Sequence, residues 1–313
     1  MKFISYSHKD KHSIGVLINE KDKFIDIYDC SDGKLPDNML LYLQDFENNN
    51  ILLKQILLKG DNKVKDIKSV KLNAPLPNPN SFRDAYAFRQ HVEAGRKNRG
   101  LDMIPEYDQF PVFYFSNHNS ICGPGHVTVQ EKHLNKLDFE FELGIIISKK
   151  GRNIKAKDAH KYIAGLVILN DWSARGMQFE EMKLNLGPAK GKDFATSIGP
   201  YLVTLDELEK KRINSDEGFA YNLKMQGYLN DKLVSEDNMK NMTWSFPRII
   251  ERISYGVDIY PGDLIGSGTC ATGCLLENNL SLDNPKWLTE NDIVAFKVEC
   301  LGTLQSIIVK NNS

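Results

Sequence analysis

The sequence predicts an α+β fold in which a small, mostly β N-terminal domain precedes a larger, strand-rich domain. Two observations lead to this prediction. Short apolar runs of strand length recur along the chain, whereas helical composition is confined to a few segments. Prolines at every second position, Pro75, Pro77 and Pro79, separate the two parts. A chain of 313 residues is long enough to bury a large core beside a small domain.

Residues 1–72 are the predicted N-terminal domain. Its apolar patterns indicate three strands and one helix, at residues 3–6, 14–18, 24–28 and 38–46. Residues 73–80 are the predicted linker, because alternate prolines forbid a helix and remove the hydrogen-bond donors of a strand. The larger predicted domain covers residues 81–313.

Composition excludes several classes of partner. The chain has 40 Lys and Arg residues and 41 Asp and Glu residues, so its formal net charge is -1, and a broad basic surface for nucleic acid is not expected. No apolar run approaches the roughly 20 residues of a membrane helix. The first ten residues are charged and contain no apolar core of a signal peptide. We therefore expect a cytoplasmic protein with no membrane partner.

The five cysteines are scattered, which favours reduced, structural thiols. Cys270 and Cys274 form a C-x3-C pair, but the chain contains no second pair to complete a structural zinc site of the usual kind.

Residues 137–143 alternate strictly between apolar and acidic side chains. An extended strand would place Asp138, Glu140 and Glu142 on one face. Neighbours on that face lie about 6.8 Å apart, and two carboxylates at this distance repel by about 2.5 kcal/mol at an effective dielectric constant near 20. A bound cation would relieve the repulsion. The alternative is a half-exposed strand whose outer face is acidic.

Two further acids occupy positions suited to a site. A helix that begins at Asp84 would place Asp84, Phe88 and His91 on one face, with the acid at the positive helix end. The alternatives are an N-capping aspartate and a solvated or core histidine. The apolar strand predicted at residues 162–169 ends in Asp171, where a sheet holds a carboxylate in place, although an ordinary Asx turn has the same pattern.

The remaining segments predict further elements. Lys192 lies in a glycine-bearing loop that lacks the Walker spacing of a phosphate loop. The turn at residues 266–269 has a bare backbone that could approach an anionic ligand. Helices are predicted at residues 155–160 and 245–255, and strands at residues 110–115, 201–204, 221–226, 263–269, 274–277, 293–298 and 305–309.

Five segments, taken together and in order, resemble the fumarylacetoacetate hydrolase family from about residue 82 to the C-terminus. They are the acidic-aromatic segment ending at His91, the acids at residues 138–142, the Asn-Asp-Trp-Ser-Ala-Arg run at residues 170–175, the loop at residues 191–196, and residues 266–269 with Glu277. The resemblance implies a mixed, rolled β-sheet core and a homodimer.

The resemblance implies a divalent metal held by Asp84, Glu140, Glu142 and Asp171, with Lys192 and Thr196 beside it. Oxygen ligands of this kind suit Mg2+, Ca2+ or Mn2+ better than zinc. Asp138 is expected outside the ligand set.

The resemblance also implies that His91 and Glu277 activate water and that Lys192 assists catalysis. The positions that match substrate contacts in the family are Tyr86, Tyr114, Arg175, Gln178 and Thr269. Two family positions differ, since Gly100 replaces an arginine and Met182 replaces a tyrosine of the eukaryotic enzymes.

The expected activity is metal-dependent hydrolysis of a C–C bond in a small dicarbonyl acid, an acylpyruvate or a fumarylpyruvate-like or fumarylacetoacetate-like β-diketo acid. The alternatives are a 2-oxo acid decarboxylase, an isomerase or tautomerase or a dehydratase on the same metal site, and a relative that binds oxo acids without catalysis.

Overall fold

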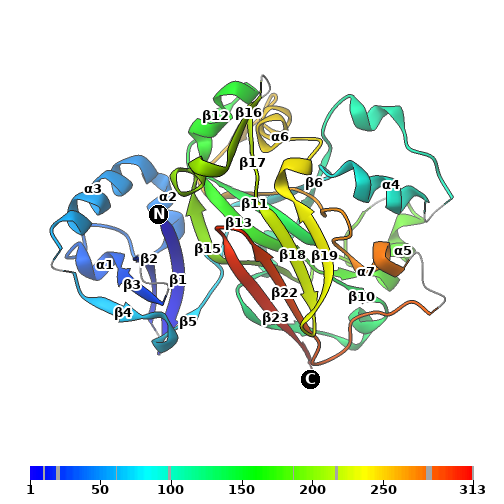
Figure 1. The fold of residues 1–313 in the computed structure, drawn as a ribbon, viewed down its shortest axis with the longest axis horizontal. Helices are drawn as coiled ribbons and strands as arrows, with labels where there is room; N and C mark the ends of the chain where they lie inside the picture. Colours follow the sequence, from blue (N-terminus) through cyan, green and yellow to red (C-terminus); the bar gives the residue numbers. More distant parts are fainter. Residues whose placement is uncertain are drawn as a thin grey trace.

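The chain folds into mixed α+β structure, as the sequence predicts, around one large mixed sheet and one smaller sheet (Figure 1). This computed structural model describes residues 1–9, 11–18, 22–60, 62–97, 100–185, 187–215, 218–279 and 284–311.

The larger sheet has the order β4-β3-β2-β1-β15-β13-β11-β21-β6-β7, with β5 beside β1 and β8 beside β15. Most pairs are antiparallel, whereas β21–β6 and β15–β8 are parallel. Its strands are β1 (Lys2–His8), β2 (Lys11–Leu17), β3 (Lys23–Asp26), β4 (Val64–Asp66), β5 (Lys71–Leu72), β6 (Ser81–Ala85), β7 (Phe113–Ser116), β8 (Ile121–Cys122), β11 (Phe141–Ile147), β13 (Ile163–Asp171), β15 (Thr196–Thr204) and β21 (Asp263–Gly266).

The smaller sheet has five strands: β19 (Lys232–Asn238), β18 (Lys224–Leu229), β22 (Ile293–Val298), β23 (Gly302–Lys310) and β9 (Gly125–Val129). Three short pairs complete the described strands: β10 (Leu137–Asp138) with β14 (Ser173–Ala174), β12 (Gly151–Arg152) with β20 (Asp258–Ile259), and β16 (Arg212–Ser215) with β17 (Gly218–Tyr221).

The two sheets pack face to face through aromatic side chains. Phe141 of β11 stacks on Phe296 of β22 with ring centroids 4.1 Å apart, and Phe139 meets the same ring edge-on at 5.5 Å. All three rings are fully buried. The apolar half of the alternating segment therefore belongs to the main core, which fixes the strand that carries Glu142.

The N-terminal strands extend the larger sheet, because β1 hydrogen-bonds to β15 with Phe3 opposite Leu202. Figure 1 shows this part, in blue, beside the rest of the chain. The boundary at residues 73–80 stays a prediction. The helices here are α1 (Ile27–Cys30), α2 (Met39–Gln44) and α3 (Phe46–Leu58). The sequence predicts only one helix in this part. It gives little sign of α3, because the run of asparagines near the start of α3 has low helix propensity.

Two predictions near the acids are wrong. The helix expected from Asp84 is strand β6, since its backbone pairs with β21, and the helix begins later, as α4 (Arg89–Lys97). The strand expected at residues 274–277 is a short helix, α7 (Leu275–Asn278), which Cys274 caps. The first outcome does not follow from the local pattern, because β6 is set by pairing with a strand about 180 residues away.

The other helices are α5 (Arg175–Met182) and α6 (Phe246–Ile253), of which α6 is close to the prediction. The helix expected at residues 155–160 is a 3-10 helix, η5. The 3-10 helices are η1 (Ile67–Ser69), η2 (Pro105–Asp108), η3 (His118–Ser120), η4 (Glu131–Leu134), η5 (Ala156–Tyr162), η6 (Leu205–Lys211) and η7 (Met239–Asn241). None of the helices in the described ranges combines the length and apolar character that crossing a membrane requires.

Candidate active site

Three buried acids meet where the central strands of the larger sheet end. Asp84 lies on β6, Glu142 on β11 and Asp171 at the end of β13. One carboxylate oxygen of each lies within 4.8 Å of the others. The three side chains are at most 2% exposed. Segments far apart in the sequence therefore build one acidic cluster.

Gly266 makes this cluster possible. It pairs with Asp84 across β21–β6 and with Gly144 across β21–β11. A Cβ at Gly266 would lie well inside van der Waals contact of Asp84 Oδ1 and 3.1 Å from Glu142 Oε2. The sequence predicts that the bare backbone here approaches a ligand. That approach stays a prediction, and in the structure the same bare backbone leaves room for two carboxylates.

The acidic segment is not one continuous strand. It breaks between β10 and β11, where Glu140 N–H donates to Asn170 Oδ1 at 3.0 Å and Phe141 N–H donates to the Gly273 carbonyl at 2.8 Å. The predicted ladder of three acids on one face is therefore wrong. A half-exposed acidic strand is also wrong, because Glu140 is 7% exposed and Glu142 is fully buried.

Asp138 lies outside the cluster of three acids and shares the partner Arg175 with Glu140. It forms an ion pair with Arg175 at 2.8 Å and accepts hydrogen bonds from the N–H groups of Leu275 and Leu276 at 2.7 and 3.0 Å. It therefore anchors α5 to the start of α7. Strand alternation alone gives no signal for this role.

Two buried cations neutralise part of the acidic charge. Arg175 Nη2 lies 2.8 Å from Glu140 Oε1, and Lys192 Nζ contacts both Glu140 Oε2 and Asp171 Oδ2, the latter at 2.6 Å. Tyr114 OH donates to the same Asp171 oxygen at 2.7 Å. Both oxygens of Glu140 are thus engaged by cations, and this acid lies outside the group of three.

The other oxygen of Asp171, Oδ1, is buried and has no hydrogen-bond partner among the described residues. A buried, unpartnered carboxylate oxygen is costly unless a cation or proton faces it. This oxygen and the acidic oxygens within 4.8 Å of Asp171 fit a hard divalent cation, which prefers oxygen ligands.

The excess of negative charge shifts the ionisation of these acids. Burial and the neighbouring Asp171 carboxylate raise the pKa of Asp84 to about 7. Burial and Asp84 raise the pKa of Glu142 well above its usual value. Burial opposes ionisation of Glu140, but the charges of Lys192 and Arg175 outweigh it and lower its pKa. The metal-free cluster therefore holds protons that a divalent cation would displace.

His91 and Glu277 form a second constellation beside the acids. His91 Nδ1 lies 3.0 Å from Glu277 Oε2, and both side chains are about nine-tenths buried. They come from α4 and α7, which contact each other. The Tyr86 ring meets the imidazole edge-on at 5.9 Å between centroids. Cys274, for which the sequence predicts no site, lies within 4.8 Å of both members of the pair.

A cavity of about 620 Å3 joins the two constellations. Arg175 Nη1 donates to Gln178 Oε1 at 2.9 Å, and Thr269 Oγ1 lies 3.5 Å from Glu142 Oε1. Thr196, at the start of β15, is buried and lies opposite Asp171 of β13. It does not line the cavity. The predicted site residues that line it are Asp84, Tyr86, His91, Tyr114, Glu140, Glu142, Arg175, Gln178, Lys192, Thr269 and Glu277.

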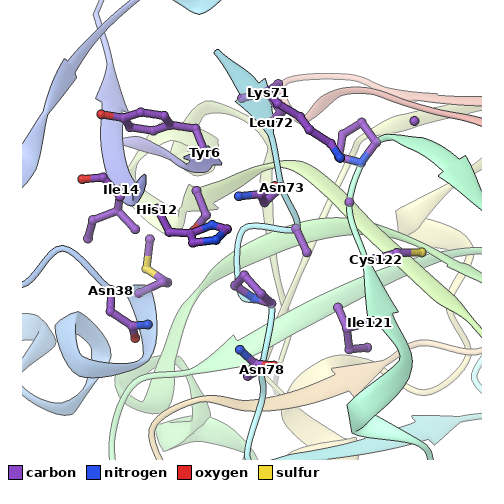
Figure 2. Close-up of a pocket in the computed structure, with 18 of the residues that line it drawn as sticks. Tyr6, His12, Ile14, Asn38, Lys71, Leu72, Asn73, Asn78, Ile121 and Cys122 are labelled. Carbon is purple, nitrogen blue, oxygen red and sulfur yellow. The ribbon is translucent and has the colours of Figure 1, made fainter. Parts of the chain in front are cut away.

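A second cavity, of about 960 Å3, lies between the N-terminal strands and the rest of the chain. Figure 2 shows the segment with Asn73 and Asn78 crossing between the two sides. Asp37, which is exposed, is the one acid in its described lining. This cavity lacks the buried charges of the first, which we therefore take as the candidate active site.

Solved structures share this fold over nearly the whole chain. A fumarylacetoacetate hydrolase from psychrophilic Exiguobacterium antarcticum is 22% identical with a TM-score of 0.75, covering 99% of this chain and 100% of that one. A maleylpyruvate hydrolase from Sphingobium sp. SYK-6, in complex with manganese(II) and pyruvate, is 21% identical with a TM-score of 0.73, covering 100% of both chains. A 5-carboxymethyl-2-hydroxymuconate delta-isomerase from Mycobacterium smegmatis is 18% identical with a TM-score of 0.69, covering 99% of this chain and 100% of that one.

Sequence relatives agree with this likeness. Fumarylacetoacetase from Arabidopsis thaliana is 29% identical over 275 residues, which cover 71% of this chain and 65% of that protein, so the chain spans about two thirds of its length. An uncharacterized protein of Staphylococcus aureus is 28% identical and covers 99% of this chain and 100% of its own length. The family model described as fumarylacetoacetate (FAA) hydrolase C-terminal matches residues 80–309. The chain therefore belongs to the fumarylacetoacetate hydrolase family.

Proposed function

We propose that this protein is a divalent-metal-dependent hydrolase that cleaves a C–C bond in a β-diketo acid of the acylpyruvate type. The observation that supports it most directly is the shared cavity, which Asp84 and Glu142 of the acidic cluster and the His91–Glu277 pair line. Hydrolysis of a 1,3-dicarbonyl acid needs both groups of side chains. The acidic cluster would hold a cation that attracts the carbonyl oxygens, and the His91–Glu277 pair would activate water.

The metal ligands in this proposal are Asp84, Glu142 and Asp171, with Glu140 as the fourth acid beside Lys192. Mg2+, Mn2+ or Ca2+ matches these oxygen donors. When bound, such a cation polarises the carbonyl under attack and stabilises negative charge on the departing enolate.

His91 takes a proton from water in the proposed reaction. The ionised Glu277 carboxylate can only accept a hydrogen bond, so it favours the tautomer with the proton on His91 Nδ1 and leaves Nε2 as the base. The water oxygen forms a bond to the acyl carbonyl carbon, and the bond from that carbon to the methylene group breaks. The methylene carbon then takes up a proton, which yields pyruvate and a carboxylic acid.

The cationic side chains that line the cavity also have a role in the proposed reaction. Lys192 and Arg175 are held by acids, so their positive charges stay fixed where the enolate develops. Tyr86, Tyr114, Gln178 and Thr269 are the proposed substrate contacts. From the resemblance to the family we expect a homodimer. Size-exclusion chromatography with light scattering would test this oligomeric state.

Two variants separate the two halves of the site. His91→Ala should bind Mg2+ as the wild type does and lose hydrolysis of acylpyruvates, whereas Glu142→Gln should lose Mg2+ binding in calorimetry. Wild-type turnover by His91→Ala would exclude it as the base. Wild-type Mg2+ binding by Glu142→Gln would remove that acid from the ligand set.

The second candidate is an isomerase on the same metal site, which the fold shared with the Mycobacterium smegmatis isomerase favours. Decarboxylation or dehydration of a 2-oxo acid, or binding without catalysis, are further outcomes of the same assay. Incubating the protein and Mg2+ with acylpyruvates, oxaloacetate and an unsaturated hydroxy diacid, and identifying products by mass spectrometry, discriminates among them.

A further inference from the structure

A second set of metal-ligating side chains lines the same cavity as Asp84 and Glu142 of the acidic cluster. His91, Cys274 and Glu277 each offer one ligand atom within 4.8 Å of the others, and all three line the cavity. The acidic cluster offers oxygen only, whereas this group offers a thiol, an imidazole and one carboxylate. The chemistry of the two groups therefore selects different cations.

We propose that His91, Cys274 and Glu277 form a second metal site that takes a borderline-soft cation such as Zn2+, and that zinc bound there blocks the hydrolase. The binding stands on the geometry of the three side chains. The inhibition rests on the proposed function, because zinc would occupy the imidazole and carboxylate that activate water.

The spacing suits zinc. A tetrahedral ion with Zn–S near 2.3 Å and Zn–N or Zn–O near 2.0 Å separates its ligand atoms by roughly 3.3–3.6 Å. His91 Nδ1 and Glu277 Oε2 already lie 3.0 Å apart, and the sulfur lies within 4.8 Å of ligand atoms on both. Side-chain rotation about α4 and α7 covers the difference.

The Cys274 thiol must lose its proton to bind a metal. Cys274 Sγ is buried and accepts a hydrogen bond from Glu277 N–H at 3.4 Å, a donor that equally serves a thiolate. Burial raises the pKa of Cys274 well above its usual value, so the free protein carries the neutral thiol. Zinc binding breaks the S–H bond, forms an S–Zn bond and releases the proton to solvent, with no change of oxidation state.

Cys270 provides a matched control. It is as deeply buried as Cys274 and only four residues away, but its sulfur lies against Ser235 Oγ at 3.9 Å and it does not line the cavity. The C-x3-C pair of the sequence is thus no joint site. Its second cysteine instead meets ligands from α4 and α7.

The test uses cobalt as a spectroscopic probe on the full chain saturated with Mg2+. Co2+ should give a near-ultraviolet thiolate-to-cobalt charge-transfer band in the wild type and in Cys270→Ser, and no such band in Cys274→Ser. Serine also caps helices, so Cys274→Ser retains the start of α7. Cys274→Ala repeats the measurement without a hydroxyl, and equal Mg2+ affinity in calorimetry verifies that each variant is folded.

Zinc retention and inhibition are measured on the same proteins. After dialysis with excess Mg2+, the wild type and Cys270→Ser should retain one more zinc per chain than Cys274→Ser, and half-inhibition of hydrolysis should need at least tenfold more zinc in Cys274→Ser. Identical cobalt spectra or identical zinc retention in the wild type and Cys274→Ser would overturn the site. If the wild type cleaves no acylpyruvate, the proposed function fails, but the cobalt spectrum still decides whether the site exists.

Discussion

Gly266 lies directly opposite Asp84 across the parallel pair β21–β6, with no room for a side chain between its backbone and the carboxylate. Gly266→Ala should therefore push Asp84 and Glu142 apart and weaken Mg2+ binding at least tenfold, as measured by calorimetry. Gly95→Ala is the control. Gly95 lies in α4, and a Cβ there would meet Tyr86 OH at 3.6 Å, an ordinary van der Waals distance. Equal Mg2+ affinity in both variants would show that the acids do not depend on the bare backbone.

Lys192 stabilises the metal-free protein by neutralising Glu140 and Asp171. Lys192→Met leaves two buried carboxylates without their ammonium and should lower the free energy of unfolding by about 3–5 kcal/mol in urea titrations without metal. Mg2+ should recover more stability in this variant than in the wild type, because the ion replaces the lost positive charge.

Lys190→Met is the matched control for this prediction. Lys190 forms an ion pair with Asp193 at 2.9 Å, but its side chain is 64% exposed, so its loss should change stability by less than about 1 kcal/mol. Equal losses in the two lysine variants would contradict a buried, charge-neutralising role for Lys192.

Metal affinity should depend on pH through Asp84. Because burial and Asp171 raise the pKa of Asp84 to about 7, the acid is protonated below that pH and must lose its proton to bind a cation. Calorimetric Mg2+ affinity should rise as the pH increases from about 5 through about 7. A constant affinity across this range would show that the acid is already ionised.

The same shift fixes the sign of the stability change. The pKa of Asp84 in the folded, metal-free protein lies above its ordinary value of 3.8, so its stabilising contribution is present at low pH and is lost as the pH rises to about 7. Melting temperatures without metal should therefore fall over this window, and Mg2+ should remove the fall. A metal-free protein that gains stability over the window would contradict the shift.

Apolar side chains at the cavity mouth predict the substrate tail. Val112, Phe179 and Met182 line the cavity and are 43%, 36% and 38% exposed, so an apolar acyl group would cover them. Alkyl acylpyruvates should have at least tenfold higher kcat/KM than fumarylpyruvate. Met182→Arg should narrow this ratio by pairing with the distal carboxylate, and a wild type that prefers fumarylpyruvate would refute the assignment.

The identity of the acids could be predicted from the sequence, and their environment could not. The family resemblance and the residue types indicate Asp84, Glu142 and Asp171, which the structure brings together from three strands. The ion pair of Asp138 with Arg175 was not predictable, because the chain breaks between β10 and β11 without any change in the alternating pattern.

Strand and helix assignments failed for a related reason. The segment at Asp84 has helical composition, yet its pairing with β21 decides its conformation, and this pairing is not visible in a local window. The largely apolar strand β13 was predictable because burial on both faces leaves an apolar run that is uninterrupted up to Leu169.

The pairing of β1 with β15 also covers a strand edge that could otherwise pair with another copy of the protein. Without residues 1–72, the end of β15 at Leu202 and Val203 would lose the neighbour that satisfies its outer N–H and C=O groups, and Ile198 and Leu202 would lose part of their apolar cover. Open edges of this kind recruit strands from other chains. A protein shortened to residues 81–313 should therefore self-associate, even though it keeps every acid of the site. Residues 1–72 would then prevent aggregation in addition to extending the sheet.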